Sequence, residues 1–64
     1  MMKNGHKINI LIIDDEEFVR TSLAEYLKDN GYDVSCAESA EKAFEMVDNK
    51  DFDAAIVDLR LPIS

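Results

Sequence analysis

The stretch that determines the fold is the apolar run Ile8-Asn9-Ile10-Leu11-Ile12-Ile13, followed directly by the acidic run Asp14-Asp15-Glu16-Glu17. A run that is apolar at almost every position and rich in isoleucine is typical of a strand covered on both faces. Acidic residues suit the start of a helix, because the positive end of the helix dipole lies there. The sequence therefore predicts a buried strand over about residues 8–13 and a helix over about residues 16–29.

The following segments continue the alternation of strands and helices. Residues 32–36 alternate between apolar and polar side chains, which favours a short strand at a sheet edge. Residues 39–48 begin at a serine able to cap a helix and carry an apolar face at helical spacing. A further apolar run predicts a strand over about residues 53–58.

This βαβαβ order predicts an α/β fold with a parallel sheet. Right-handed crossovers that place the second and third strands on opposite sides of the first give the strand order 2-1-3, with a helix on each face and hence three layers. The helical faces expected to pack on the sheet consist of Val19, Leu23, Tyr26 and Leu27 in the first helix and Ala40, Ala43, Phe44 and Val47 in the second. We also expect Cys36 to pack as a small core residue of the second strand.

Length, charge and composition narrow the range of functions. With 64 residues we expect one unit rather than a multi-domain enzyme, and with one cysteine and one histidine we expect neither an internal disulfide nor a zinc site. The net charge of −7 would repel phosphate backbones, which argues against direct nucleic-acid binding by this segment. No apolar stretch has the length of a signal peptide or a membrane span, so we expect a cytoplasmic protein without membrane contact.

Three carboxylates are predicted to meet at one edge of the sheet. Asp14 and Asp15 follow the first strand and Asp58 ends the third, and the carboxyl ends of parallel strands lie at the same edge. Taken singly, each is explained by helix capping or by a solvated loop. Together they would repel each other unless a cation held them, and oxygen ligands favour Mg²⁺. Asp58, opposite the acidic pair, is then the candidate nucleophile toward a phosphoryl group.

Three segments carry a resemblance to a known family. They are Ile10-Leu11-Ile12-Ile13-Asp14-Asp15-Glu16, Asn30-Gly31-Tyr32 and Ala55-Ile56-Val57-Asp58-Leu59-Arg60-Leu61-Pro62. Jointly they resemble the first half of a response-regulator receiver domain of two-component signalling, which has a flavodoxin-like fold. The resemblance implies a phosphoacceptor signalling domain rather than an enzyme, with Asp58 phosphorylated by a sensor histidine kinase. It also implies that Mg²⁺ is held at Asp14, Asp15 and Asp58, with the main-chain carbonyl of Arg60 as a further ligand.

The sequence also departs from that family. A receiver has five strands and five helices, so we expect residues 1–64 to be a truncated receiver domain or an excerpt of a longer regulator. The family's hydroxyl residue at the end of the fourth strand and its lysine at the end of the fifth have no counterpart in residues 1–64. One alternative is a half-receiver that is not phosphorylated and forms a homodimer through the exposed edge of its third strand. Another is a metal-dependent hydrolase with Asp58 as its nucleophile.

Overall fold

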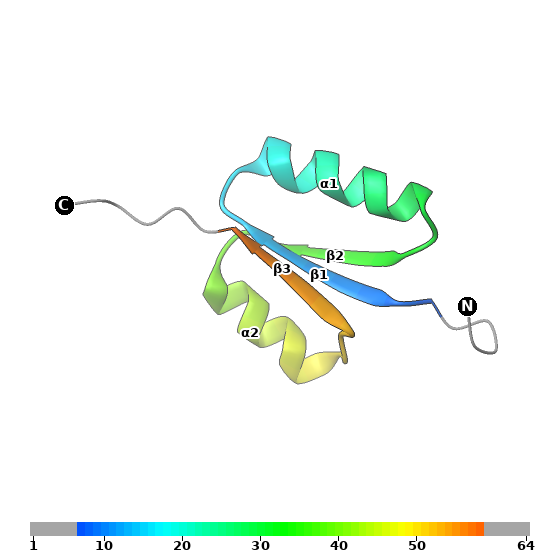
Figure 1. Ribbon diagram of the computed structural model, residues 1–64. Helices are drawn as coiled ribbons and strands as arrows, with labels where there is room; N and C mark the ends of the chain where they lie inside the picture. The colour runs from blue at the N-terminus through cyan, green and yellow to red at the C-terminus, as the bar shows by residue number, and fades with distance from the viewer. Residues whose placement is uncertain (1–6, 59–64) are drawn as a thin grey trace.

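The computed structural model describes residues 7–58 as a three-stranded sheet with a helix on each face (Figure 1). Its elements are β1 (Asn9–Asp14), α1 (Glu17–Asp29), β2 (Asp33–Ala37), α2 (Ala40–Asn49) and β3 (Ala54–Asp58). All strand pairs are parallel, and β1 lies between β2 and β3, which gives the order 2-1-3. The predicted α/β architecture of a βαβαβ unit is confirmed.

The core lies on the two faces of β1, whose residues from Ile10 to Asp14 are all buried. Successive side chains of a strand point to opposite faces, so β1 contributes to two separate clusters. The cluster beneath α2 consists of Leu11, Ile13, Ala37 and Ala43, and the cluster beneath α1 consists of Ile10, Ile12 and Ala24. In each helix the buried residue is an alanine, whose small side chain lets the helix backbone approach the sheet closely.

The predicted apolar faces of the helices are wrong in part. Tyr26 is 65% exposed and Phe44 is 69% exposed, and Val47 is also exposed, whereas Met46 packs against the cluster beneath α2. Three strands present a narrow surface, so only a thin stripe of each helix meets the sheet, and that stripe is centred on the alanines. The side chains at the margins of each predicted face therefore extend beyond the sheet into solvent.

The two helices begin and end at residues with identifiable roles. The Oγ of Ser39 accepts a hydrogen bond from the Lys42 amide at 3.2 Å, which confirms the predicted cap of α2. Asn30 is the C-cap of α1, and Gly31 follows it with a φ of 94°, a conformation that costs glycine little. Neither helix is long and apolar enough to cross a membrane, within residues 7–58.

Truncation of Ile12 should remove most of the stability of the fold. Ile12 is 0% exposed, and removing such a buried side chain costs about 2–5 kcal/mol, a large part of the stability of a small domain. Ile12→Ala should therefore shift the chain strongly toward the unfolded state in urea denaturation followed by circular dichroism. Ile8→Ala, at a residue 45% exposed, is the matched control and should change the midpoint little. Equal midpoints for the two variants would contradict the assigned core.

Candidate functional site

Asp14 and Asp58 lie side by side at the carboxyl ends of two adjacent strands. Asp14 is the last residue of β1, Asp58 is the last residue of β3, and the two are partners in the register of the parallel pair. Neighbouring strands are roughly 5 Å apart, and register partners project to the same face of a sheet. Asp14 is two residues after Ile12, which packs beneath α1, so the two side chains point to the same face of the sheet. Asp58 is the register partner of Asp14, so both carboxylates are on the face that α1 covers. The fold thus brings together two acidic residues 44 positions apart in the chain.

This edge of the sheet is the place where an α/β fold of this topology binds ligands. The chain runs from β1 to β2 on one side and then crosses to β3 on the other side of β1, with α1 and α2 on opposite faces of the sheet (Figure 1). In open α/β sheets, ligands bind beyond the carboxyl ends of the strands at the point where the strand order reverses. The pair formed by Asp14 and Asp58 lies at this switch point.

The two carboxylates differ in their surroundings. Asp14 is 3% exposed and is the buried charged residue of the described part of the chain, whereas Asp58 is exposed. The Oδ1 of Asp14 accepts a hydrogen bond from the Glu16 amide at 2.9 Å, which compensates for part of the lost hydration. The main-chain carbonyl of Asp14 accepts a second bond, at 2.7 Å, from the Nη1 of Arg20 in α1. The residues that follow β1 therefore donate hydrogen bonds both to the side chain and to the main chain of the buried Asp14.

The remaining predicted ligands are not assembled into a closed metal site. Asp15 is exposed at the turn between β1 and α1. Arg60 lies outside the described residues, so its predicted main-chain ligand remains a prediction. Within residues 7–58, no group of three or more His, Cys, Asp or Glu side chains is arranged to hold a metal ion. The structure brings Asp14 next to Asp58 and leaves the edge open.

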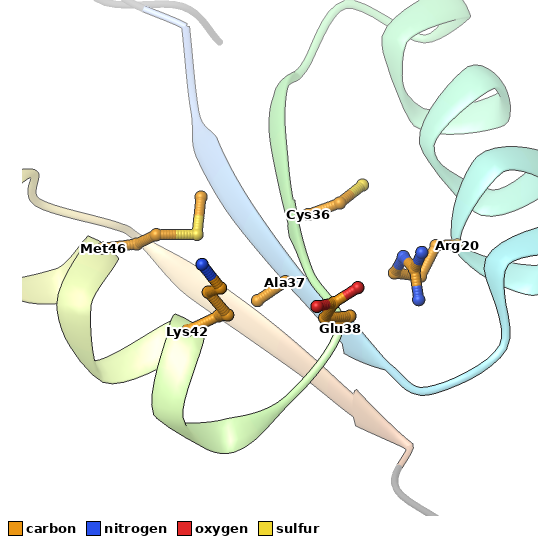
Figure 2. A pocket seen from close by; sticks show the side chains of 6 residues that line it. All are labelled: Arg20, Cys36, Ala37, Glu38, Lys42 and Met46. Atoms are coloured by element: carbon orange, nitrogen blue, oxygen red, sulfur yellow. The ribbon is translucent and has the colours of Figure 1, made fainter.

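A pocket lies at the outer edge of β2 (Figure 2). This β2-edge pocket has a volume of about 340 Å³ and is lined by Arg20, Cys36, Ala37, Glu38, Lys42 and Met46. Arg20 and Lys42 come from different helices, with the residues of β2 between them in the view of Figure 2. Arg20 lines this pocket and also donates a hydrogen bond to the main-chain carbonyl of Asp14.

Two features of this region differ from the sequence interpretation. Cys36 was expected in the core, but its thiol is exposed, because β2 is an outer strand and the pocket opens beside it. Arg20 received no role from sequence reasoning, although it contacts Asp14 directly. The available signal was its position as a cation in the first turns of a helix that starts with acidic residues. Sequence alone cannot tell whether such a cation reaches back to the strand or extends into water.

Comparison with known proteins identifies the family. The model of the response regulator receiver domain matches residues 10–63. The chain belongs to the response regulator receiver domain family. This match includes both Asp14 and Asp58 and confirms the resemblance seen in the sequence. The family is a signalling domain that is generally not catalytic, that interacts with histidine kinases and that generally binds Mg²⁺ at its phosphorylation site.

Several curated proteins are similar over most of this receiver segment. A cyclic di-GMP phosphodiesterase of Thermotoga maritima is 40% identical over 55 residues, which are 86% of this chain and 14% of that protein. Response regulator MprA of Mycobacterium sp. is 36% identical over 55 residues, 86% of this chain and 24% of that protein. A response regulator receiver protein of Anaeromyxobacter sp. is 38% identical over 53 residues, 83% of this chain and 22% of that protein.

The chain thus spans at most about a quarter of the length of these relatives. What the relatives do as whole proteins is a property of chains several times longer. No solved structure matches the chain at a significant level.

The exposed position of Cys36 predicts that its thiol reacts with a thiol reagent in the folded protein at nearly the rate seen in denaturant. A matched control is the double variant Cys36→Ser with Ala37→Cys, which moves the thiol to a neighbouring position that is buried beneath α2. This control should react at least about tenfold more slowly when folded, since a buried thiol reacts only during opening. Equal protection of the two thiols would contradict the described edge of β2.

Proposed function

We propose that this receiver segment is a phosphoacceptor, in which Asp58 receives a phosphoryl group from a sensor histidine kinase. The observation that carries the proposal is the register pairing of Asp58 with the buried Asp14 at the carboxyl edge of the sheet. Of the two, Asp58 is the exposed carboxylate, so it is the one that a partner protein can reach. Membership of the receiver family supports the same assignment, and the kinase is the corresponding partner.

We assign Mg²⁺ as the cofactor, held by Asp14, Asp15, Asp58 and the main-chain carbonyl of Arg60. The donor set fits, because the acidic side chains at this edge offer hard oxygen ligands and Mg²⁺ commonly binds one or two carboxylates while keeping several waters. The Glu16 amide uses one acceptor position of the Asp14 carboxylate, which has further lone pairs with which to hold a cation. When bound, Mg²⁺ neutralises the charge of the phosphoryl oxygens and of the clustered carboxylates.

The reaction needs little covalent chemistry from the protein. A carboxylate oxygen of Asp58 attacks the phosphorus of the kinase phosphohistidine, an O–P bond forms, and the N–P bond breaks. The histidine nitrogen leaves with the bonding electron pair and takes up a proton from water. Asp58 thereby becomes an acyl phosphate. In this role the segment accepts a group and transmits a signal, so we do not assign it hydrolase activity.

The same proposal includes a cytoplasmic location, where sensor kinases present their phosphohistidine. Direct binding to nucleic acid is not part of it, since the chain carries a net charge of −7.

Replacement of Asp58 should abolish phosphorylation. Incubation of the wild-type chain with a small phosphodonor and Mg²⁺ should add the mass of one phosphoryl group, measured by intact-mass spectrometry, and chelation of Mg²⁺ should prevent the addition. Asp58→Asn should remain unmodified because its amide is a poor nucleophile. Asp51→Asn, which removes an exposed carboxylate from the turn before β3, is the matched control and should be modified like the wild type. Equal modification of Asp58→Asn and the wild type would sink the proposal.

We propose self-association of the 64-residue polypeptide as a second candidate function. All five residues of β3 are exposed, and within residues 7–58 the strand pairs with β1 along one edge only. An unpaired edge offers a row of main-chain donors and acceptors to another strand. Ile56 and Val57 add exposed apolar surface along that edge. A second copy related by a two-fold axis would pair β3 with β3 and give a continuous six-stranded sheet.

This pairing predicts a dimer that weakens at low salt, because each chain carries a charge of −7 and screening reduces their repulsion. Size-exclusion chromatography with light scattering should show the dimer at micromolar concentration. Val57→Lys, on the β3 edge, should shift it to monomer, whereas Val47→Lys, on the exposed side of α2, should not. A wild-type chain that is monomeric at this concentration, folded or unfolded, would exclude self-association.

A further inference from the structure

We infer that Arg20 is a positioning residue of the acidic site, which holds the main chain of Asp14 in the conformation that binds the cation. The inference rests on the proposed function, because it concerns the same site. Its basis is the hydrogen bond of 2.7 Å from the Nη1 of Arg20 to the Asp14 carbonyl oxygen. Arg20 is half-buried and lies in α1, so the contact ties the helix back to the end of β1.

Three hydrogen bonds form a closed chain around this turn. The Arg20 side chain donates to the Asp14 carbonyl, the Glu16 amide donates to Oδ1 of Asp14 at 2.9 Å, and the Arg20 amide donates to the Glu16 carbonyl at 3.0 Å. Each bond shares a residue with the next, so a displacement of one must strain the others. The side chain of Arg20 therefore contributes to the orientation of the Asp14 carboxylate, although it does not touch it.

The place of this contact along the strand explains why it is needed. Pairing of β1 with β2 ends at Ile13 and Ala37, whereas pairing with β3 continues one residue further, to Asp14 and Asp58. At Asp14 the strand has therefore lost its neighbour on the β2 side. Arg20 reaches the main chain at this point, and its guanidinium also forms a wall of the β2-edge pocket (Figure 2). A charged donor to a carbonyl makes a stronger hydrogen bond than a neutral one.

Because Arg20 is positively charged, the direction in which its removal changes Mg²⁺ affinity tests the inference. A guanidinium near the acidic edge repels an incoming cation, so its removal would strengthen Mg²⁺ binding if charge alone mattered. If Arg20 instead positions Asp14, its removal should weaken Mg²⁺ binding in spite of the favourable change in charge. A lysine at this position keeps the charge but has a compact ammonium in place of the planar guanidinium fork.

The experiment is a Mg²⁺ titration of the whole chain, followed through the amide resonances of residues 14–16 by NMR, together with hydrogen exchange of the Glu16 amide without Mg²⁺. We expect Arg20→Met to bind Mg²⁺ about tenfold more weakly, in line with the loss of one charge-assisted hydrogen bond. Its Glu16 amide should exchange several-fold faster than that of the wild type. Arg20→Lys should lie between the two, and it keeps the test valid if Arg20→Met does not fold.

Lys42→Met is the matched control, because Lys42 lines the same pocket as Arg20 and its replacement removes the same positive charge (Figure 2). This variant should bind Mg²⁺ as tightly as the wild type or slightly more tightly, and its Glu16 exchange should be unchanged. Mg²⁺ binding by Arg20→Met or Arg20→Lys that equals or exceeds that of the wild type would overturn the inference, as would an equal loss in Lys42→Met. If the wild type does not bind Mg²⁺, the proposed function fails, and the Glu16 exchange rates alone decide whether Arg20 holds the turn.

Discussion

The burial of β1 on all four sides is the constraint on which the rest of the structure depends. It hydrogen-bonds to β2 along one edge and to β3 along the other, and it contacts α1 on one face and α2 on the opposite face. A strand in this position must be apolar at nearly every residue, because neither face is wetted. Four successive residues, Ile10 to Ile13, satisfy that requirement. Each of the other four elements therefore shields one edge or one face of β1 from solvent.

The same constraint gives the acidic site its character. Asp14 continues the buried strand by one residue, so its carboxylate is enclosed by the fold although it lies at the rim of the sheet. A carboxylate with so little exposure is costly unless hydrogen bonds or a cation compensate it. The Glu16 amide and the Arg20 guanidinium provide hydrogen bonds to this residue, and both belong to the start of α1. The strand that forms the core therefore also fixes the position of Asp14 at the carboxyl edge of the sheet.

The exposed surfaces of the two outer strands have different characters. β2 ends beside a pocket with a cationic side chain from each helix, whereas β3 has an apolar edge exposed along its whole length. Apolar residues such as Val57 are what an interior strand requires, and the relatives of this chain are several times longer. Within residues 7–58, the edge of β3 therefore combines unpaired main-chain groups with exposed apolar side chains.

The sequence by itself determined the architecture, because hydrophobic periodicity and helix-end residues are local signals. The continuous run before Asp14 indicated a doubly covered strand, Ser39 and Gly31 marked helix ends, and the alternation of elements required parallel pairing. It also placed Asp14 and Asp58 at the same edge, since parallel strands all end on one side. Only the tertiary structure decided which helix residues face the sheet, that Cys36 is exposed, and that Arg20 turns back to the Asp14 carbonyl. These depend on the width of the sheet and on how the helices sit against it, and no pattern of neighbouring residues encodes such distances.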